Sequence, residues 1–140
     1  MEIGDLNTFF TSNKALANVM SVTTVSDANP ELSKEIFARI TKAHMKARSR
    51  IVKVLNDMYY QEMDEEECLN LNIEYLPDGQ IKTQEDVEKF ISEHMASQMP
   101  LDRPQWKVWV QRKYLGDKGI VIWKAHHSLC DGMSSMAFNL

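Results

Sequence analysis

The sequence predicts an α+β fold, in which a mixed or antiparallel sheet carries two main helices and a short C-terminal helix. Segments rich in valine and threonine, or with alternating polarity, predict strands, whereas apolar residues at helical spacing predict helices. These segments follow one another in the order strand, helix, strands, helix, hairpin, helix, which is typical of α+β proteins. The 140 residues suit a single domain that can bury a core.

The first part of the chain predicts one strand, one amphipathic helix and two further short strands. Residues 19–25 are rich in valine and threonine and predict the first strand. A helix begins at Asn29-Pro30, because proline is tolerated at the first helical position. Its apolar face consists of Leu32, Ile36, Phe37, Ile40 and Ala43. Residues 48–55 predict a short strand, and Tyr59-Tyr60 begins another.

The middle of the chain predicts a strand followed by a second helix. The acidic run at residues 64–67 is interpreted as a solvated loop rather than a metal site. Residues 69–76 alternate apolar and polar side chains and predict a half-buried strand, which Pro77-Asp78-Gly79 ends in a turn. Thr83 and Asp86 have capping-box spacing. The following helix has an apolar face and ends at Pro100; this face consists of Val87, Phe90, Ile91 and Met95.

The last part of the chain predicts a hairpin and the start of a helix. Residues 106–111 alternate in polarity, and residues 116–119 form a turn. Residues 120–125 return as a strand whose apolar run predicts burial on both faces. Residues 133–140 have helical spacing, and the sequence stops inside this pattern. We therefore expect either a fragment or a short terminal helix.

Composition excludes several classes of function. The net charge of −4 gives no basic field that would attract nucleic acid or an anionic membrane surface. Cys68 and Cys130 have no CxxC spacing, which argues against a disulfide framework and fits a reducing compartment. The first ten residues lack the basic region of a secretory signal, and no apolar run approaches the ~18 residues of a membrane span.

The chemically informative segment is residues 126–132, HHSLCDG, which follows the second strand of the hairpin. Histidine is the side chain best suited to moving a proton near neutral pH, and a strand end can direct its ring into a cleft. Asp131 can hold the turn by accepting hydrogen bonds. Gly132 permits a backbone conformation that a Cβ would penalise.

Other interpretations of these residues remain open from chemistry alone. Either histidine can equally be a hydrogen-bonded structural residue. A zinc site made of His126, His127, Cys130 and Asp131 is disfavoured, because adjacent strand residues point to opposite faces. Cys130 lacks an orienting group for a nucleophile, and Ser128 lacks a G-x-S-x-G elbow. His44 and His94 are interpreted as surface or boundary residues of helices.

Two motifs resemble those of a known family. Residues 126–132 resemble the HHxxxDG motif, which is shared by wax ester synthase/diacylglycerol acyltransferases and by condensation domains of nonribosomal peptide synthesis. Both groups belong to the chloramphenicol-acetyltransferase-like superfamily. Residues 100–106, PLDRPQW, resemble the PLDxxxPxW element of the first group but are shorter between Asp102 and Pro104. Together the motifs favour the wax ester synthase/diacylglycerol acyltransferase family.

The resemblance implies a chloramphenicol-acetyltransferase-like half-domain with O-acyltransferase chemistry. A fatty acyl group would pass from acyl-CoA to a long-chain alcohol or diacylglycerol, with acyl-CoA as co-substrate and with no metal or bound cofactor. His127 would be the general base, His126 would support it, Asp131 would orient the segment and Gly132 would allow its turn. Packing around the site would come from Pro100, Leu101, Asp102, Pro104 and Trp106.

The resemblance also implies that residues 1–140 form the N-terminal portion of such an enzyme, truncated after the HHxxxDG motif and lacking the second half of the fold. We expect little activity from this portion alone. Its location would be the endoplasmic reticulum membrane or a lipid droplet surface, through peripheral contact. Two alternatives remain: a condensation-type domain that uses carrier-protein thioesters, and a non-catalytic fragment that binds lipid or a partner.

Overall fold

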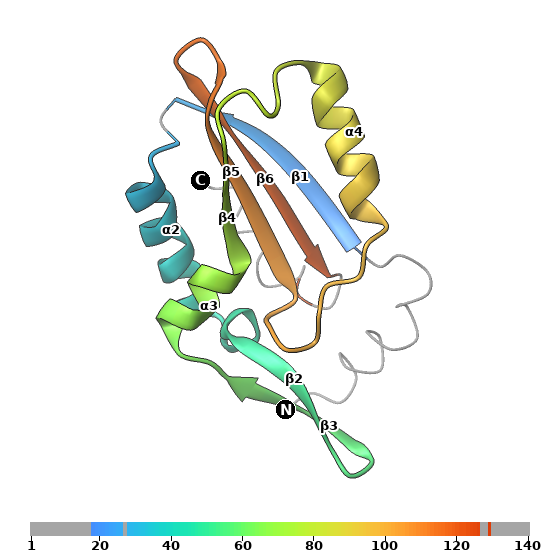
Figure 1. The fold of residues 1–140 in the computed structure, drawn as a ribbon. Helices are drawn as coiled ribbons and strands as arrows, with labels where there is room; N and C mark the ends of the chain where they lie inside the picture. The colour runs from blue at the N-terminus through green and yellow to red at the C-terminus, as the bar shows by residue number, and fades with distance from the viewer. Residues whose placement is uncertain (1–17, 27, 127–128, 130–140) are drawn as a thin grey trace.

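A four-stranded mixed sheet forms the centre of the computed structural model, which describes residues 18–26, 28–126 and 129 (Figure 1). The strand order is β1 (Asn18–Val25), β6 (Lys118–His126), β5 (Trp106–Leu115) and β4 (Ile73–Leu76). The strand β6 is antiparallel to both of its neighbours, β1 and β5, whereas β4 runs parallel to β5. The predicted mixed sheet and hairpin are confirmed.

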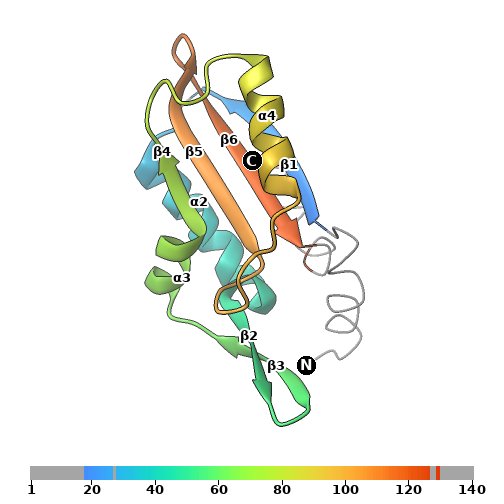
Figure 2. The ribbon, with the colours of Figure 1, turned by 45° about the vertical axis from the view of Figure 1, so that its right-hand side comes forward.

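Helices cover both faces of this sheet, with α4 (Gln84–Met95) in front of it and α2 (Pro30–Ala43) behind it in Figure 2. Side chains of β5 alternate between the two faces. Trp106 packs in a cluster with Phe37 of α2, whereas Trp109 packs with Phe90 of α4. The strand β6 is buried on both faces in the same way, as its continuous apolar run predicts.

Both predicted helix starts are confirmed by their capping contacts. The side chain of Asn29 accepts a hydrogen bond from the backbone N–H of Glu31 at 2.9 Å, and Pro30 occupies the first helical position. At α4, Thr83 and Asp86 form a reciprocal capping box. Each contact satisfies backbone donors that a helix start leaves without intrahelical partners.

The structure corrects the prediction for residues 64–76. The acidic run is not a loop, because Asp64 caps the helix α3 (Glu65–Asn72) by accepting from the N–H of Glu67 at 3.3 Å. The predicted strand at residues 69–76 is therefore wrong in its first half, and only β4 is extended. Acidic side chains in the first turn complement the helix dipole, and the buried Cys68 and Leu69 anchor α3. Among the described residues α3 is thus a third helix, and the predicted helix at residues 133–140 lies outside them.

A separate two-stranded hairpin projects from one end of the molecule (Figures 1 and 2). It consists of β2 (Ser49–Val54) and β3 (Asp57–Glu62), preceded by the 3₁₀ helix η2 (Met45–Arg48), and it confirms the two short strands predicted here. The backbone N–H of Ile51 donates to the carbonyl oxygen of Leu101 at 3.2 Å. This bond ties the hairpin to the loop that precedes β5.

Candidate functional site

The central strand β6 ends at the first histidine of the predicted motif. His126 lies opposite Asn18 of β1, and its backbone N–H donates to the carbonyl oxygen of Gln105 at 2.9 Å. Its residue surface is only 4% exposed. Because strand residues alternate, the side chain of His126 shares the α4 side of the sheet with Ile122 and Lys124.

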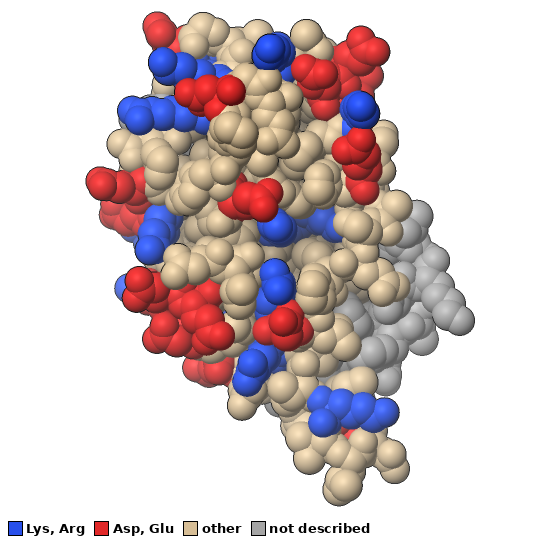
Figure 3. All heavy atoms as spheres, viewed as in Figure 1, with Lys and Arg blue, Asp and Glu red and all other residues tan. Residues whose placement is uncertain are grey.

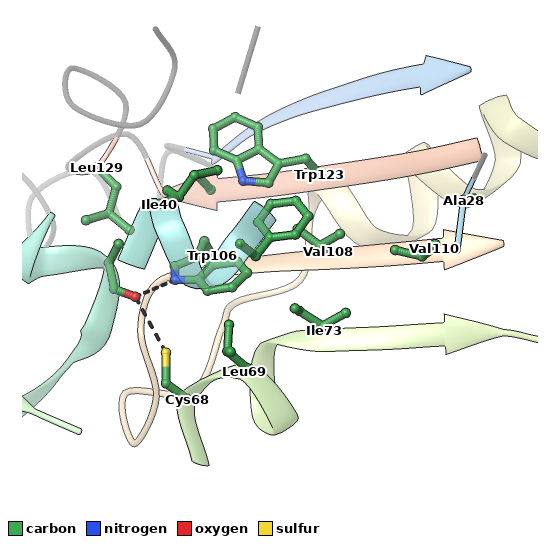
Figure 4. Packing of buried hydrophobic residues seen from close by; sticks show 13 residues of the cluster. Ala28, Ile40, Cys68, Leu69, Ile73, Trp106, Val108, Val110, Trp123 and Leu129 are labelled. Carbon is green, nitrogen blue, oxygen red and sulfur yellow. Dashed lines mark hydrogen bonds between the residues drawn. The ribbon is translucent and has the colours of Figure 1, made fainter. Parts of the chain in front are cut away.

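The remainder of the motif is described only in part. The predicted general base His127 lies outside the described residues, as do Ser128, Cys130, Asp131 and Gly132. Leu129 is described, and it is buried in the cluster that contains Ile40 and Trp106 (Figure 4). The two described residues of the motif thus lie apart, His126 at the end of β6 and Leu129 in the core on the α2 side.

The PLDRPQW segment, residues 100–106, lies directly beside the end of β6. The side chain of Gln105 donates to the carbonyl oxygens of Pro100 at 2.8 Å and Arg103 at 3.1 Å, which closes the loop on itself. The backbone carbonyl of the same glutamine accepts the N–H of His126. The structure thus brings together the two segments that resemble family motifs, although they are twenty residues apart in the chain.

Pro104, Gln105 and Trp106 are the buried residues of this segment. The Nε1–H of Trp106 donates to the carbonyl oxygen of Ala47 at 2.7 Å, and the thiol of Cys68 approaches the same oxygen at 3.6 Å (Figure 4). Pro104 is fully buried. The exposed Leu101 contributes a backbone acceptor to the hairpin, as described above. Packing around the loop therefore depends mainly on the proline and the tryptophan.

Asp102 lies on the outside of the loop. Its carboxylate pairs with the guanidinium of Arg103 at 3.0 Å, and its side chain is 66% exposed. An exposed pair of this kind contributes little to stability. Pro100 is exposed as well, and its carbonyl oxygen receives the bond from Gln105.

Lys124 is a buried cation that the sequence pattern did not single out. It is 1% exposed, and its Nζ donates to the carbonyl oxygens of His94 and Ser97 and, at 3.1 Å, to the Ser97 hydroxyl. His94 is in the last turn of α4 and Ser97 lies just beyond it, and a cation is favoured by the helix dipole at this end of a helix. Burial, and then the nearby Lys107, lower the pKa of Lys124. The lysine therefore ties the end of α4 to β6, two residues before His126.

A cavity of about 230 Å³ lies beside this contact on the α4 side of the sheet. The charged or titratable residues of its lining are Lys124, Lys107, Arg103, Glu74 and His94. The ring of His94 packs against Phe90 and Trp109, with ring centroids 4.1 and 4.7 Å apart. Burial lowers the pKa of His94, and Lys124 lowers it further. His94 is thus a boundary residue, as interpreted from the sequence.

The described residues offer little for metal or thiol chemistry. Within them, no three His, Cys, Asp or Glu side chains gather where they could hold a metal ion. Burial, followed by the charges of Glu65 and Glu67, raises the pKa of the Cys68 thiol to about 12. A thiol with so high a pKa is not a nucleophile near neutral pH.

The face of the molecule seen in Figure 3 carries both acidic and basic side chains, with a group of acidic ones over α3, whose first turn contains Glu65, Glu66 and Glu67. None of the helices that the structure describes is both long and apolar enough to cross a membrane.

No protein-family model matches the chain, and a comparison with curated proteins gives no match either. Solved structures do match. The starter condensation domain of rhizomide synthetase RzmA is 10% identical, over 98% of this chain and 35% of that chain, with a TM-score of 0.73. The wax ester synthase/diacylglycerol acyltransferase from Marinobacter aquaeolei VT8 is 18% identical, over 88% and 32%, with a TM-score of 0.59.

A third match is the condensation domain that releases the chain from the enacyloxin polyketide synthase, with 16% identity, coverage of 80% and 22%, and a TM-score of 0.61. At such identities the likeness concerns the fold. It confirms the predicted α+β fold, which this chain shares with a portion of each of these condensation and acyltransferase structures. The chain spans about a third or less of the length of each of these proteins.

Proposed function

We propose that this chain is the N-terminal portion of an O-acyltransferase, which transfers a fatty acyl group from acyl-CoA to a long-chain alcohol or diacylglycerol. The observation that supports this most directly is the 2.9 Å bond between the N–H of His126 and the carbonyl oxygen of Gln105. It joins the HHSLCDG segment to the PLDRPQW segment at the end of a buried strand. A rigid strand end can hold a catalytic side chain in a fixed position.

In the proposed reaction His127 is the general base. Its ring takes the proton of the acceptor hydroxyl while that oxygen attacks the carbonyl carbon of the thioester. The tetrahedral intermediate then collapses, the carbon–sulfur bond breaks, and His127 returns the proton to the leaving thiolate. The products are an ester and free CoA. No acyl-enzyme forms, because the hydroxyl attacks directly.

Other residues have supporting roles in this proposal. His126 holds the backbone ahead of the base, Asp131 orients the turn, and Gly132 permits it. The second half of the fold would supply the opposite wall of the cleft and the donors that stabilise the oxyanion. Such an enzyme needs acyl-CoA as co-substrate but no metal, and it would meet its lipid substrates by peripheral contact with the endoplasmic reticulum membrane or a lipid droplet.

The test is ester formation by the protein encoded by the complete transcript, with labelled acyl-CoA and either a fatty alcohol or diacylglycerol. We expect His127→Ala to lower kcat by about 10²–10⁴-fold, the usual contribution of general acid–base catalysis. The matched control is His44→Ala, a histidine at the end of α2, which should leave kcat unchanged. Equal activity of the wild type and His127→Ala would remove the base assignment.

A condensation-type reaction is the second candidate, because the RzmA condensation domain matches 98% of this chain with the higher TM-score. Such a domain would take its acyl group from a carrier protein rather than from free CoA. Supplying the same acyl group on CoA and on a carrier protein separates the two candidates. Turnover of the CoA thioester alone supports the O-acyltransferase, and turnover of the carrier-bound thioester alone supports condensation.

A further inference from the structure

Among the residues that the structure describes, a cavity lies on either face of the central sheet, and the two cavities differ in chemistry although each has a volume of about 230 Å³. The cavity on the α4 side contains the charged groups described above. The cavity on the α2 side lies between α2 and the strands β1 and β6, and none of the described residues that line it is charged. The second cavity is therefore suited to a different kind of ligand.

Apolar side chains make up most of the α2-side cavity. The sheet contributes Val25, Val121 and Trp123, and the helix contributes Leu32, Ile36 and Phe37. The remaining lining residues are serine or threonine, which can accept or donate hydrogen bonds without carrying charge. Burial of an aliphatic chain here would be favoured by the hydrophobic effect and would not remove water from any charged side chain of the described lining.

We propose that the α2-side cavity binds part of the linear aliphatic chain of a lipid substrate. This inference rests on the proposed acyl transfer. Pockets that hold a whole ligand usually measure ~300–1,000 Å³, so a cavity of about 230 Å³ takes a segment of chain rather than the entire molecule.

The position of the cavity along β6 fits this role. Trp123 lines the cavity and lies three residues before His126 on the same strand. At ~3.3 Å per strand residue, the indole is about 10 Å from the strand end. A substrate whose reacting group lies at the end of β6 could therefore place its chain along this face of the strand.

The cavity on the α4 side is the poorer candidate for an apolar chain. An aliphatic chain there would displace water from the ion pair of Lys107 and Glu74, whose charged atoms are 3.7 Å apart. Lys124 also lines this cavity. Desolvation of charged groups opposes such binding. The difference between the two cavities therefore favours the α2-side cavity as the site of the aliphatic chain.

The experiment measures quenching of tryptophan fluorescence in the 140-residue chain by two probes. One is a medium-chain carboxylic acid with a terminal bromine, and the other is the matching brominated alcohol. Thr23 and Thr24 offer a matched pair, since both are exposed on β1 but only Thr23 lines the cavity. Thr24 pairs with Ile120, which belongs to the cluster on the α4 side.

We expect Thr23→Phe to fill the cavity and weaken probe binding about tenfold or more, and Thr24→Phe to leave it within about twofold of the wild type. Phenylalanine is favourable in strands, so both variants should fold. Leu32→Arg, which changes the half-exposed opposite wall, should weaken binding as Thr23→Phe does. Tighter binding of the acid indicates that the cavity holds the aliphatic chain of the acyl donor. Tighter binding of the alcohol indicates that it holds the aliphatic chain of the acceptor.

Absence of quenching in the wild type would overturn the inference, as would equal weakening by Thr23→Phe and Thr24→Phe. Neither result depends on turnover, because the measurement requires no ester formation. Conversely, loss of the His127 effect on kcat would overturn the proposed function without changing the binding result. The two proposals can therefore fail separately.

Discussion

Trp106 and Trp109 are buried on the same strand, β5, but on opposite faces of the sheet, and their indole nitrogens differ. The Nε1–H of Trp106 donates to the carbonyl oxygen of Ala47 at 2.7 Å. The Nε1–H of Trp109 has no hydrogen-bond partner among the described residues. A buried donor without a partner loses its bonds to water and gains nothing in return. The two indoles should therefore respond differently to the loss of their N–H groups.

We predict that Trp106→Phe lowers the free energy of unfolding by about 1–3 kcal/mol more than Trp109→Phe does. Both changes remove similar apolar area. Only the first removes a hydrogen bond, and it leaves the Ala47 carbonyl with the long contact to Cys68 alone. Urea denaturation of the two variants measures the difference. Equal destabilisation would mean that the bond to Ala47 contributes nothing net.

Lys124 illustrates what the sequence could not predict at this scale. Residues 120–125 predict a buried strand, and a lysine inside such a run is expected to break the pattern or face solvent. Instead its Nζ finds acceptors in His94 and Ser97, which are 30 and 27 residues away in the chain. A local sequence pattern cannot predict a contact between residues so far apart in the chain. This contact follows only from the tertiary arrangement of α4 and β6.

Among the elements, α3 is the one for which two local sequence patterns disagreed, and the prediction followed the wrong one. Apolar residues at alternate positions from Leu69 to Tyr75 satisfy a strand pattern, and that pattern predicted the wrong structure for residues 69–72. Asp64 followed by Glu67 has the spacing of a helix N-cap with an acidic residue at N3, a signal that favours the helix. A segment of eight helical residues is too short for its periodicity to decide between the two.

Gly119 fixes how closely the hairpin β5–β6 approaches the start of α2. A Cβ at this position would lie 2.3 Å from the Cβ of Ala28 and 2.8 Å from the carbonyl oxygen of Arg112. We predict that Gly119→Ala lowers the free energy of unfolding by about 1–3 kcal/mol, because Ala28 and the backbone of β5 would have to move. Differential scanning calorimetry would detect this as a lower Tm.

The matched control is Gly116→Asn in the turn of the same hairpin. Gly116 has φ +60, and nothing lies within 4 Å of a Cβ built there. Asparagine tolerates this left-handed conformation better than most residues, so the change should cost less than Gly119→Ala. If the two variants had the same Tm, close packing at Gly119 would not be the cause of its destabilisation.

For the whole molecule, the sequence predicted the architecture better than the site. Strand and helix patterns are local, and they identified α2 and α4 from one apolar face each and β6 from an apolar run that is buried on both faces. The site depends on contacts between distant segments. The motifs at residues 100–106 and 126–132 could be recognised separately, but the bond between Gln105 and His126 follows from the pairing of β5 with β6. The roles of His126, His127 and Asp131 stay predictions.

The docking of α4 onto the sheet gives the molecule a pH dependence that can be measured. Burial first, and then the charge of Lys124, lower the pKa of His94 below its ordinary value of 6.5. The native state therefore binds the proton of His94 more weakly than the unfolded chain does. Within the window between the lowered pKa and 6.5, the unfolded state carries more protons, so the free energy of unfolding rises with pH.

We predict that His94→Phe flattens this rise, because phenylalanine can keep the ring contacts with Phe90 and Trp109 but cannot titrate. The contribution should be below about 1 kcal/mol, since the ring is only partly buried and solvent screens it. The measurement is the difference between the urea-unfolding curves of wild type and variant from acidic to neutral pH, which cancels the carboxylates common to both. A difference that does not change with pH would show that α4 docks on the sheet independently of the charge on His94.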